Sequence, residues 1–191
     1  MSFSPRFTDA LVYTAEIHKD QIRKGSGIPY ISHLLAVCAL VIEHGGDEDQ
    51  AIAALLHDAA EDQGGYETLT EIRARFGDRV ARLVEELSDS FETPKPAWRA
   101  RKETYLLHLP LAGRDSWLIS LADKVHNART ILADHALIGE EIWDRFRQGR
   151  AGAVWYYRSL VTLFLKLNPG YLSQELDRVV TEMEKIALMF P

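Results

Sequence analysis

Apolar residues recur along nearly the whole chain with the 3.6-residue period of an α-helix, and no segment alternates apolar and polar residues as a half-buried strand does. Glycine and proline separate the periodic segments, at Gly25–Pro29, Gly45–Gly46, Gly64–Gly65, Pro94–Pro96, Gly113 and Asn168–Gly170. The pattern predicts an all-α fold of about ten helices, at residues 6–20, 31–44, 49–62, 67–76, 78–90, 97–109, 115–134, 139–149, 152–167 and 170–189.

None of these breaks is long enough to serve as a linker between domains. The 191 residues therefore most simply form one domain, and a domain of that size buries roughly 70% of the surface that its extended chain exposes. We expect a single compact multi-helix bundle over residues 1–191 that needs neither disulfides nor a structural zinc ion.

The composition excludes several classes of protein. A formal net charge of −6 argues against a general nucleic-acid binder, which is normally basic. The apolar run LLAVCALVI at residues 34–42 is far shorter than the ~20 residues that cross a bilayer, and the N-terminal MSFSPRFTD has no secretory signal. The single cysteine, Cys38, lies inside the apolar run and indicates a reducing compartment. We expect a soluble, cytoplasmic protein without membrane contact and with no evident obligate protein partner.

The segment ALLHDAAEDQ at residues 54–63 places four ionisable side chains directly behind the apolar run AIAALL. On a regular helix they share an arc of about 140°, opposite the apolar side chains. These residues are His57, Asp58, Glu61 and Asp62. A solvated polar face is the ordinary explanation of such an arc, but Ala53 and Ala54 extend this face where a solvated helix favours long charged residues. Something is therefore expected to pack or bind close to the backbone.

Charge repulsion in this segment points to a bound cation. Three carboxylates within five positions repel one another, and burying them unpaired would cost several kcal/mol each. His57 and Asp58 supply the imidazole and carboxylate ligands that suit a first-row divalent metal. The sequence therefore indicates a metal site that begins at this histidine–aspartate pair.

Further ligands stand on two other predicted helices. His33 lies near the start of the apolar segment PYISHLLAVCALVI, where a histidine is ordinarily a hydrogen-bonded core residue. In SWLISLADKVHNARTIL, Asp123, Asn127 and Thr130 share one face at i, i+4 and i+7, opposite an apolar face. Two histidines and two aspartates could together supply four ligands and leave positions open for water and substrate, as a catalytic metal requires.

Three segments in this order carry a resemblance: IRKGSGIPYISHLLAV, AALLHDAAED and LISLADKVHNARTIL. They resemble the HD-domain hydrolases of the RelA/SpoT family, which degrade guanosine tetraphosphate and pentaphosphate. The similarity runs from about residue 6 to residue 165. Long members of that family carry a synthetase domain and regulatory domains after the hydrolase, so a chain of this length resembles the stand-alone small alarmone hydrolases.

The resemblance implies a role for each motif residue. It implies that one Mn²⁺ ion is held by His33, His57, Asp58 and Asp123. It implies that the remaining carboxylates, Glu61 and Asp62, act on the attacking water. Arg23 and Lys24 match a basic pair beside the nucleoside, where a guanidinium can stack on the purine. Asn127 matches a polar residue on the ribose and phosphate side.

Two further groups of residues could reach a polyanionic substrate. The segment PKPAWRARKE supplies four cations within eight positions, namely Lys95, Arg99, Arg101 and Lys102. If these cations face the substrate, they compensate locally for the negative net charge of the protein. Alternatively, they form an ordinary solvated helix face. In WYYRSL, Tyr156 or Tyr157 points toward the substrate or belongs to the core.

The leading function is a Mn²⁺-dependent 3′-pyrophosphohydrolase that removes pyrophosphate from the ribose 3′ position of purine alarmones such as ppGpp and pppGpp. The same chemistry on ppApp or another nucleotide phosphoester is an alternative within the hydrolases. A non-catalytic nucleotide sensor is an alternative from another class, and its expected signature is loss of a ligand or of the Glu61–Asp62 pair. All six residues are present, which favours an enzyme.

Overall fold

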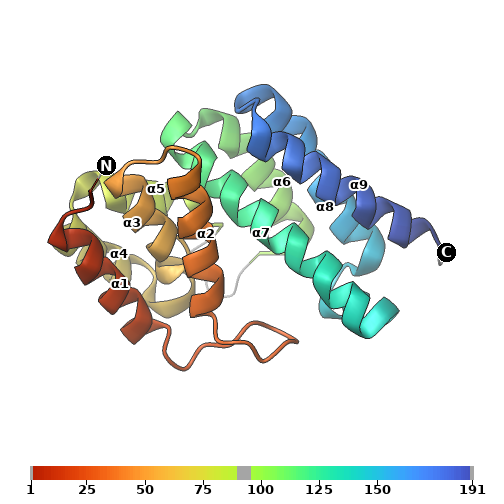
Figure 1. Ribbon diagram of the computed structural model, residues 1–191, viewed down its shortest axis with the longest axis horizontal. Coiled ribbons are helices and arrows are strands. Elements are labelled where there is room, and N and C mark those ends of the chain that lie inside the picture. The colour runs from red at the N-terminus through yellow and green to blue at the C-terminus, as the bar shows by residue number, and fades with distance from the viewer. Residues whose placement is uncertain (1, 90–95, 190–191) are drawn as a thin grey trace. The chain divides into compact units, whose positions relative to one another are not determined.

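The computed structural model describes residues 2–89 and 96–189 (Figure 1). Its nine α-helices in these ranges are α1 (Pro5–Ile17), α2 (Ile31–Glu43), α3 (Glu48–Leu56), α4 (Tyr66–Phe76), α5 (Asp78–Leu87), α6 (Trp98–His108), α7 (Arg114–Ile138), α8 (Gly149–Leu167) and α9 (Tyr171–Met189). These ranges contain no strand, although an isolated antiparallel bridge pairs Ile22 with Pro29. The all-α prediction is confirmed, with nine described helices instead of about ten. None of them is both long enough and apolar enough to span a membrane.

Side-chain caps fix where α1 and α3 begin. The Ser4 hydroxyl accepts a hydrogen bond from the Arg6 N–H (3.3 Å), and Pro5 occupies the first turn of α1, where its missing N–H costs nothing. Asp47 and Gln50 form a capping box at α3, in which each side chain accepts the other residue's backbone N–H at 3.0 Å. Because α3 begins at a fixed residue, its C-terminal end, which precedes residues 57 and 58, is also fixed.

Two of the predicted helices differ from the helices in the structure. Residues 139–149 form only a short 3₁₀ helix at Gly139–Arg145. Gly139 and Gly149 both have φ of +60°, and these left-handed positions interrupt the helical backbone at both ends of the predicted segment. Residues 49–62 are not one regular helix either, because α3 ends at Leu56 and a π-helix follows at Ala60–Gly64.

The residue contacts divide the chain into two compact units. The first unit comprises Met1–Pro96 and Ala112–Ser120, and the second comprises Ala97–Leu111 and Leu121–Pro191. The helix α7 contributes residues 114–120 to the first unit and residues 121–138 to the second. A single domain over residues 1–191 stays a prediction.

In the first unit, α3 is the central helix, packed against α1, α2 and α5. All residues of α3 from Gln50 to Leu56 are buried, and Ala53 and Ala54 are completely so. Their small side chains allow neighbouring helices to approach closely on every side of α3. The expectation that something packs near this backbone is therefore met by the protein's own helices.

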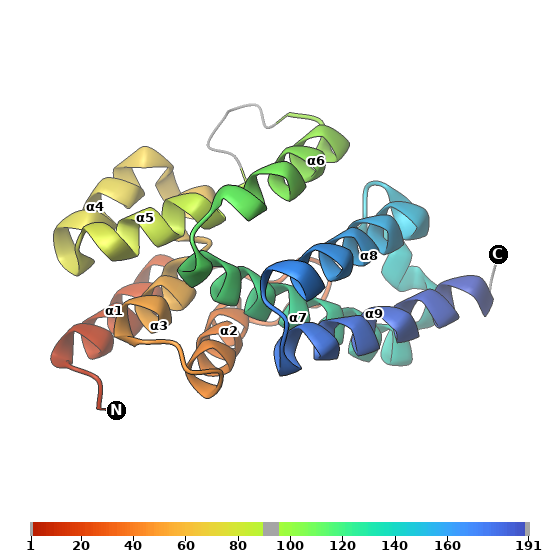
Figure 2. The ribbon, with the colours of Figure 1, turned by 90° about the horizontal axis from the view of Figure 1, so that it is seen from above.

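In the second unit, α8 and α9 form an antiparallel hairpin whose core includes Phe164, Leu160 and Leu176 (Figure 2). On its surface, Arg158 Nη1 pairs with Asp177 (2.6 Å) and its Nη2 with Glu184 (2.5 Å). These ion pairs join the two helices across their exposed seam.

A charge network around Arg79 supports the N-terminal end of α3, and it predicts acid sensitivity. The guanidinium lies 2.7 Å from Asp47, 3.1 Å from Asp49 and 2.7 Å from Asp115. Burial alone would raise the pKa of Asp47, but the Gln50 N–H and the Arg79 guanidinium outweigh burial and hold this pKa below its ordinary value. Because the folded pKa is the lower one, the stabilisation is present above the unfolded pKa and disappears as pH falls through the folded pKa.

We therefore expect Arg79→Ala to lower the free energy of unfolding at neutral pH by roughly 0.5 to 1 kcal/mol, a modest value because the ion pairs are partly exposed. The deficit relative to wild type should shrink below about pH 4, as the Asp47 carboxylate protonates. Urea unfolding of the two proteins across this pH range measures the difference. An equal deficit at neutral and at acid pH would show that Arg79 contributes through packing instead of charge.

Candidate active site

The His57–Asp58 pair lies where the regular helix α3 gives way to a π-helix. His57 keeps helical dihedrals (φ −59°, ψ −30°), and beyond it the Gly65 N–H donates to the Ala60 carbonyl at i+5 (2.8 Å). A π-turn takes up an extra residue and is frequent at functional sites. The turn widens only after Ala60, because the Asp62 N–H still donates to the Asp58 carbonyl at i+4 (2.9 Å), so Glu61 and Asp62 follow Asp58 by about one turn.

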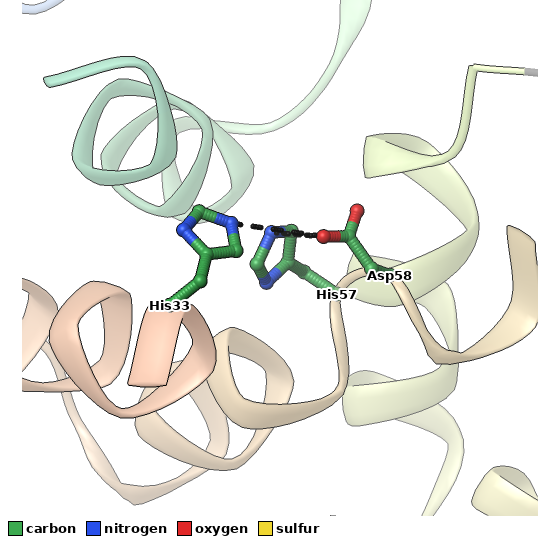
Figure 3. A group of neighbouring side chains, drawn as sticks. All are labelled: His33, His57 and Asp58. Carbon is green, nitrogen blue, oxygen red and sulfur yellow. Dashed lines mark ion pairs between the residues drawn. The ribbon is translucent and has the colours of Figure 1, made fainter. Parts of the chain in front are cut away.

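His33, His57 and Asp58 form a compact group in the first unit (Figure 3). One potential ligand atom from each residue lies within 4.8 Å of the other two. The Asp58 Oδ2 atom is 3.1 Å from the Nε2 of His57 and 3.7 Å from the Nε2 of His33. The two imidazole rings meet edge to face at 5.3 Å. A histidine and an adjacent histidine–aspartate pair 24 positions later thus present three donor atoms to one point.

The surroundings of these residues fit a divalent metal. The Nδ1 of His57 lies 2.8 Å from the Ala54 carbonyl oxygen, so Nδ1 carries a hydrogen and Nε2 is the ring nitrogen that faces Asp58. Both histidines are buried, with 1% of His33 and 5% of His57 exposed. Two oriented imidazoles and a carboxylate are the donor set of a first-row transition-metal ion.

Tyr30 supports this group, and the sequence analysis did not identify it. Its hydroxyl donates to the Asp58 Oδ2 atom at 2.6 Å, and its ring meets the His33 ring at 5.5 Å. Tyr30 stands immediately before α2 and three residues before His33. That spacing of about one helical turn was the available signal.

The two carboxylates of the π-helix are held by different neighbours. The Glu61 Oε2 atom accepts a hydrogen bond from the Asp89 backbone N–H (3.1 Å). The Asp62 Oδ2 atom accepts one from the Gln21 side-chain amide (2.8 Å). Both carboxylates therefore have a fixed donor, which restrains their direction one turn beyond Asp58.

Arg23 and Lys24 lie in the turn between α1 and α2. The Arg23 N–H donates to the Ile28 carbonyl oxygen (2.8 Å), and Gly25 and Gly27 take positive φ values of 83° and 72°. These glycines supply conformations that L side chains rarely adopt. Lys24 is exposed and Arg23 is half-buried. Their contact with a nucleoside stays a prediction.

Asp123 and Asn127 lie in the second unit, on α7. Asp123 is buried, its Oδ1 accepts a hydrogen bond from the Asn127 amide, and its Oδ2 is 2.5 Å from Lys124 Nζ. Burial alone would lower the pKa of Lys124, but the Asp123 carboxylate raises it well above its usual value. The shared face predicted for Asp123 and Asn127 is confirmed, and Lys124 is a cation that the sequence analysis missed. The role of Asp123 as a fourth metal ligand stays a prediction.

Tyr156 belongs to an aromatic cluster of the second unit. It is 6% exposed and lies edge-on to Trp98 at 5.9 Å, while Lys102 Nζ stands 5.2 Å from its ring centre. Among the described residues, no hydrogen-bond partner reaches its hydroxyl. Tyr156 is thus a core residue by packing, yet its hydroxyl retains the capacity to bind a polar group.

The predicted basic run is only partly described. Lys95 lies outside the described residues. Arg99 is engaged within the protein, because its guanidinium stacks 3.2 Å from the Trp155 ring centre and its Nε pairs with Glu103 at 2.7 Å. Lys102, another of the predicted cations, stands over the Tyr156 ring.

Comparisons with known proteins agree with these features. The HD domain family matches residues 10–153. The Xenopus tropicalis guanosine-3′,5′-bis(diphosphate) 3′-pyrophosphohydrolase MESH1 is 39% identical over 126 residues, which cover 64% of this chain and 68% of that protein. The human protein of that name is 35% identical over 133 residues, covering 68% of this chain and 72% of its own.

Longer relatives and a solved structure extend the match. The GTP pyrophosphokinase rsh of Brucella melitensis is 34% identical over 186 residues, which cover 92% of this chain but only 24% of that enzyme. The structure of a metazoan ortholog of SpoT that hydrolyzes ppGpp superimposes with a TM-score of 0.79 at 25% identity, covering 95% of this chain and 97% of that one.

Proposed function

The chain belongs to the HD-domain hydrolases, and from this we propose that it is a 3′-pyrophosphohydrolase acting on purine alarmones such as ppGpp and pppGpp. The observation that carries the proposal is the group formed by the buried His33 and His57 with Asp58, in which both histidines face one carboxylate oxygen. It occurs in a chain that is 39% identical to a guanosine-3′,5′-bis(diphosphate) 3′-pyrophosphohydrolase.

We propose one Mn²⁺ ion per chain, with His33, His57, Asp58 and Asp123 as its ligands. The imidazole–carboxylate donor set supports this assignment. A bound divalent cation would make water more acidic and offset the charge that develops on the phosphoryl oxygens and the ribose 3′ oxygen as the bond between them breaks. Tyr30 would keep Asp58 in place, because its hydroxyl already donates to the carboxylate.

Glu61 and Asp62 would act on the attacking water. In the reaction, the water oxygen forms a bond to the phosphorus attached to the ribose 3′ oxygen. The bond between that phosphorus and the 3′ oxygen breaks, the 3′ oxygen takes up a proton, and pyrophosphate leaves. Glu61 is the proposed proton acceptor, because it follows Asp58 by about one turn and its direction is restrained by the Asp89 N–H.

The remaining predicted residues would bind the nucleotide. Arg23 would stack on the purine with Lys24 beside it, and Asn127 would contact the ribose and phosphate side. Lys95 and Tyr156 complete the proposed substrate contacts. The unpartnered Tyr156 hydroxyl in the described part of the chain supports its assignment.

We also propose a cytoplasmic protein that binds neither nucleic acid nor membrane. The net charge of −6 supports this, and so does Cys38, a buried free thiol whose pKa burial raises to about 12. A thiol that stays protonated and buried suits a reducing compartment but has no nucleophilic role.

Purified protein should release pyrophosphate from ppGpp in the presence of Mn²⁺. A chelator should abolish the release because it removes the ion, and added Mn²⁺ should restore it. The measurement is chromatographic separation of the products, with ppApp and other 3′-diphosphorylated nucleotides as parallel substrates. Undiminished turnover after elemental analysis confirms metal loss would exclude the metal mechanism. Tight binding of a purine 3′-diphosphate without any turnover would identify a sensor instead.

A further inference from the structure

A hydrogen-bonded group lies beside the proposed active site, at residues to which no function has yet been given. The Gln21 side-chain Nε2 is 2.8 Å from the Asp62 Oδ2 atom. Its Oε1 is 2.6 Å from the Nε2 of Gln63 and 2.6 Å from the Nδ1 of His18. The group therefore links the end of α1 to the π-helix that carries Asp62.

The chemistry of the groups fixes every donor and acceptor in this chain of bonds. An ionised carboxylate only accepts hydrogen bonds, so Gln21 must turn its NH₂ group toward Asp62. Its carbonyl oxygen then faces the other two residues and needs donors. Gln63 supplies its NH₂ group, and His18 supplies an Nδ1–H. A flipped Gln21 amide would oppose two oxygens at Asp62 and two nitrogens at Gln63.

The backbone around Gln21 is held from both sides. Its N–H donates to the His18 carbonyl (3.0 Å), and its own carbonyl accepts from the Tyr30 N–H (2.9 Å). His18 is 2% exposed, and its ring stacks on the Tyr30 ring at 5.7 Å. Gln21 is therefore attached to a rigid base, whereas Asp62 itself is exposed on the π-helix.

From this geometry we propose that Gln21 is a positioning residue, which holds the Asp62 carboxylate in the direction needed to orient the attacking water, with His18 and Gln63 fixing its amide. The inference rests on the proposed function, because it acts through the proposed role of Asp62. The segment before α2 would then orient two carboxylates of the site, because Tyr30 in the same segment donates a hydrogen bond to Asp58.

The substitution Gln21→Glu tests this positioning role most directly. It is nearly isosteric and retains an oxygen for His18 and Gln63, but it places a carboxylate oxygen against Asp62. We expect kcat to fall by roughly 10- to 100-fold, the scale expected for a misplaced catalytic group, while KM and metal content stay near the wild-type values. Gln174→Glu, which makes the same change at an exposed position of α9, is the matched control and should be unaffected.

A double-mutant cycle separates positioning from general support of the fold. If Gln21 acts through Asp62, Gln21→Glu should have little further effect on kcat in an Asp62→Asn background. An equal fold loss in both backgrounds would overturn the proposal.

The wild type, the two single variants and the double variant also test the contact between Gln21 and Asp62 without any measurement of turnover. Gln21→Glu alone should lower the Tm by about 2 to 4 °C. Adding Asp62→Asn should recover most of that loss, because the new amide can donate to the new carboxylate. An unchanged Tm loss in the double variant would show that the contact is not formed, and would overturn the proposal. If the wild type released no pyrophosphate, the proposed function would be wrong. The Tm values would still show whether Gln21 and Asp62 are in contact.

Discussion

His57→Ala should lose its metal and its activity together. The substitution removes one of two imidazoles whose Nε2 atoms converge on Asp58, so the remaining residues can no longer complete the donor set. Loss of an outer neighbour of a metal ligand typically costs 10- to 100-fold, and loss of a ligand should exceed this, so we expect kcat/KM to fall by more than about 100-fold. Elemental analysis and turnover measured on the same preparation check the result.

The fold should survive this substitution. The apolar side chains of α3 remain packed against α1, α2 and α5, so the helix keeps most of the contacts that stabilise it. His108→Ala, at an exposed histidine of α6, is the matched control and should retain both metal and activity. Circular dichroism on both variants verifies folding. A His57→Ala protein that kept its full metal content but lost turnover would make His57 a catalytic group and not a ligand.

The periodicity of the sequence predicted the fold class and the residues of the metal group because both depend on local signals. His33 stood out as a histidine in an otherwise apolar helix, and the His57–Asp58 pair as charge behind an alanine-rich run. The structure brings these three residues together. The number of residues between His33 and the His57–Asp58 pair does not indicate how far apart their side chains lie in the fold. Their close approach followed from the family resemblance.

The π-helix at Ala60–Gly64 could not be predicted from periodicity. A regular helical wheel assumes a constant rotation per residue, whereas the i+5 bond from Gly65 to Ala60 takes up an extra residue within one turn. Sequence periodicity also left open whether Ala53 and Ala54 pack against the protein or line a binding surface, and the structure buries both of them. Small residues favour close approach, but the sequence does not say whether a helix or a ligand approaches.

The residues that hold the site carboxylates were missed for a related reason. Tyr30, Gln21 and the Asp89 N–H act through single hydrogen bonds made across the fold. Polar residues in turns are common, so Gln21 gives no distinct sequence signal, and Tyr30 offers only its spacing of three residues from His33. Such supporting contacts become visible only when the segments are placed in space.

Glu61→Gln should separate water activation from metal binding. The glutamine amide oxygen can still accept the Asp89 N–H that now reaches Glu61, so the side chain should keep its direction. What the substitution removes is the proton acceptor, and we expect kcat to fall by roughly 100-fold or more while metal content and nucleotide binding persist. Glu67→Gln, at an exposed position in the first turn of α4, is the matched control and should behave as wild type.

The comparison with His57→Ala is what makes this prediction informative. Both variants should lose turnover, but only His57→Ala should lose the metal, because His57 belongs to the converging donor group whereas Glu61 is held by the segment after α5. Metal content and turnover of all four variants, measured side by side, decide the matter. If Glu61→Gln loses its metal in step with its activity, Glu61 is a ligand and the proposed division between ligands and water-activating carboxylates is wrong. If it keeps full activity, Asp62 or the metal alone activates the water.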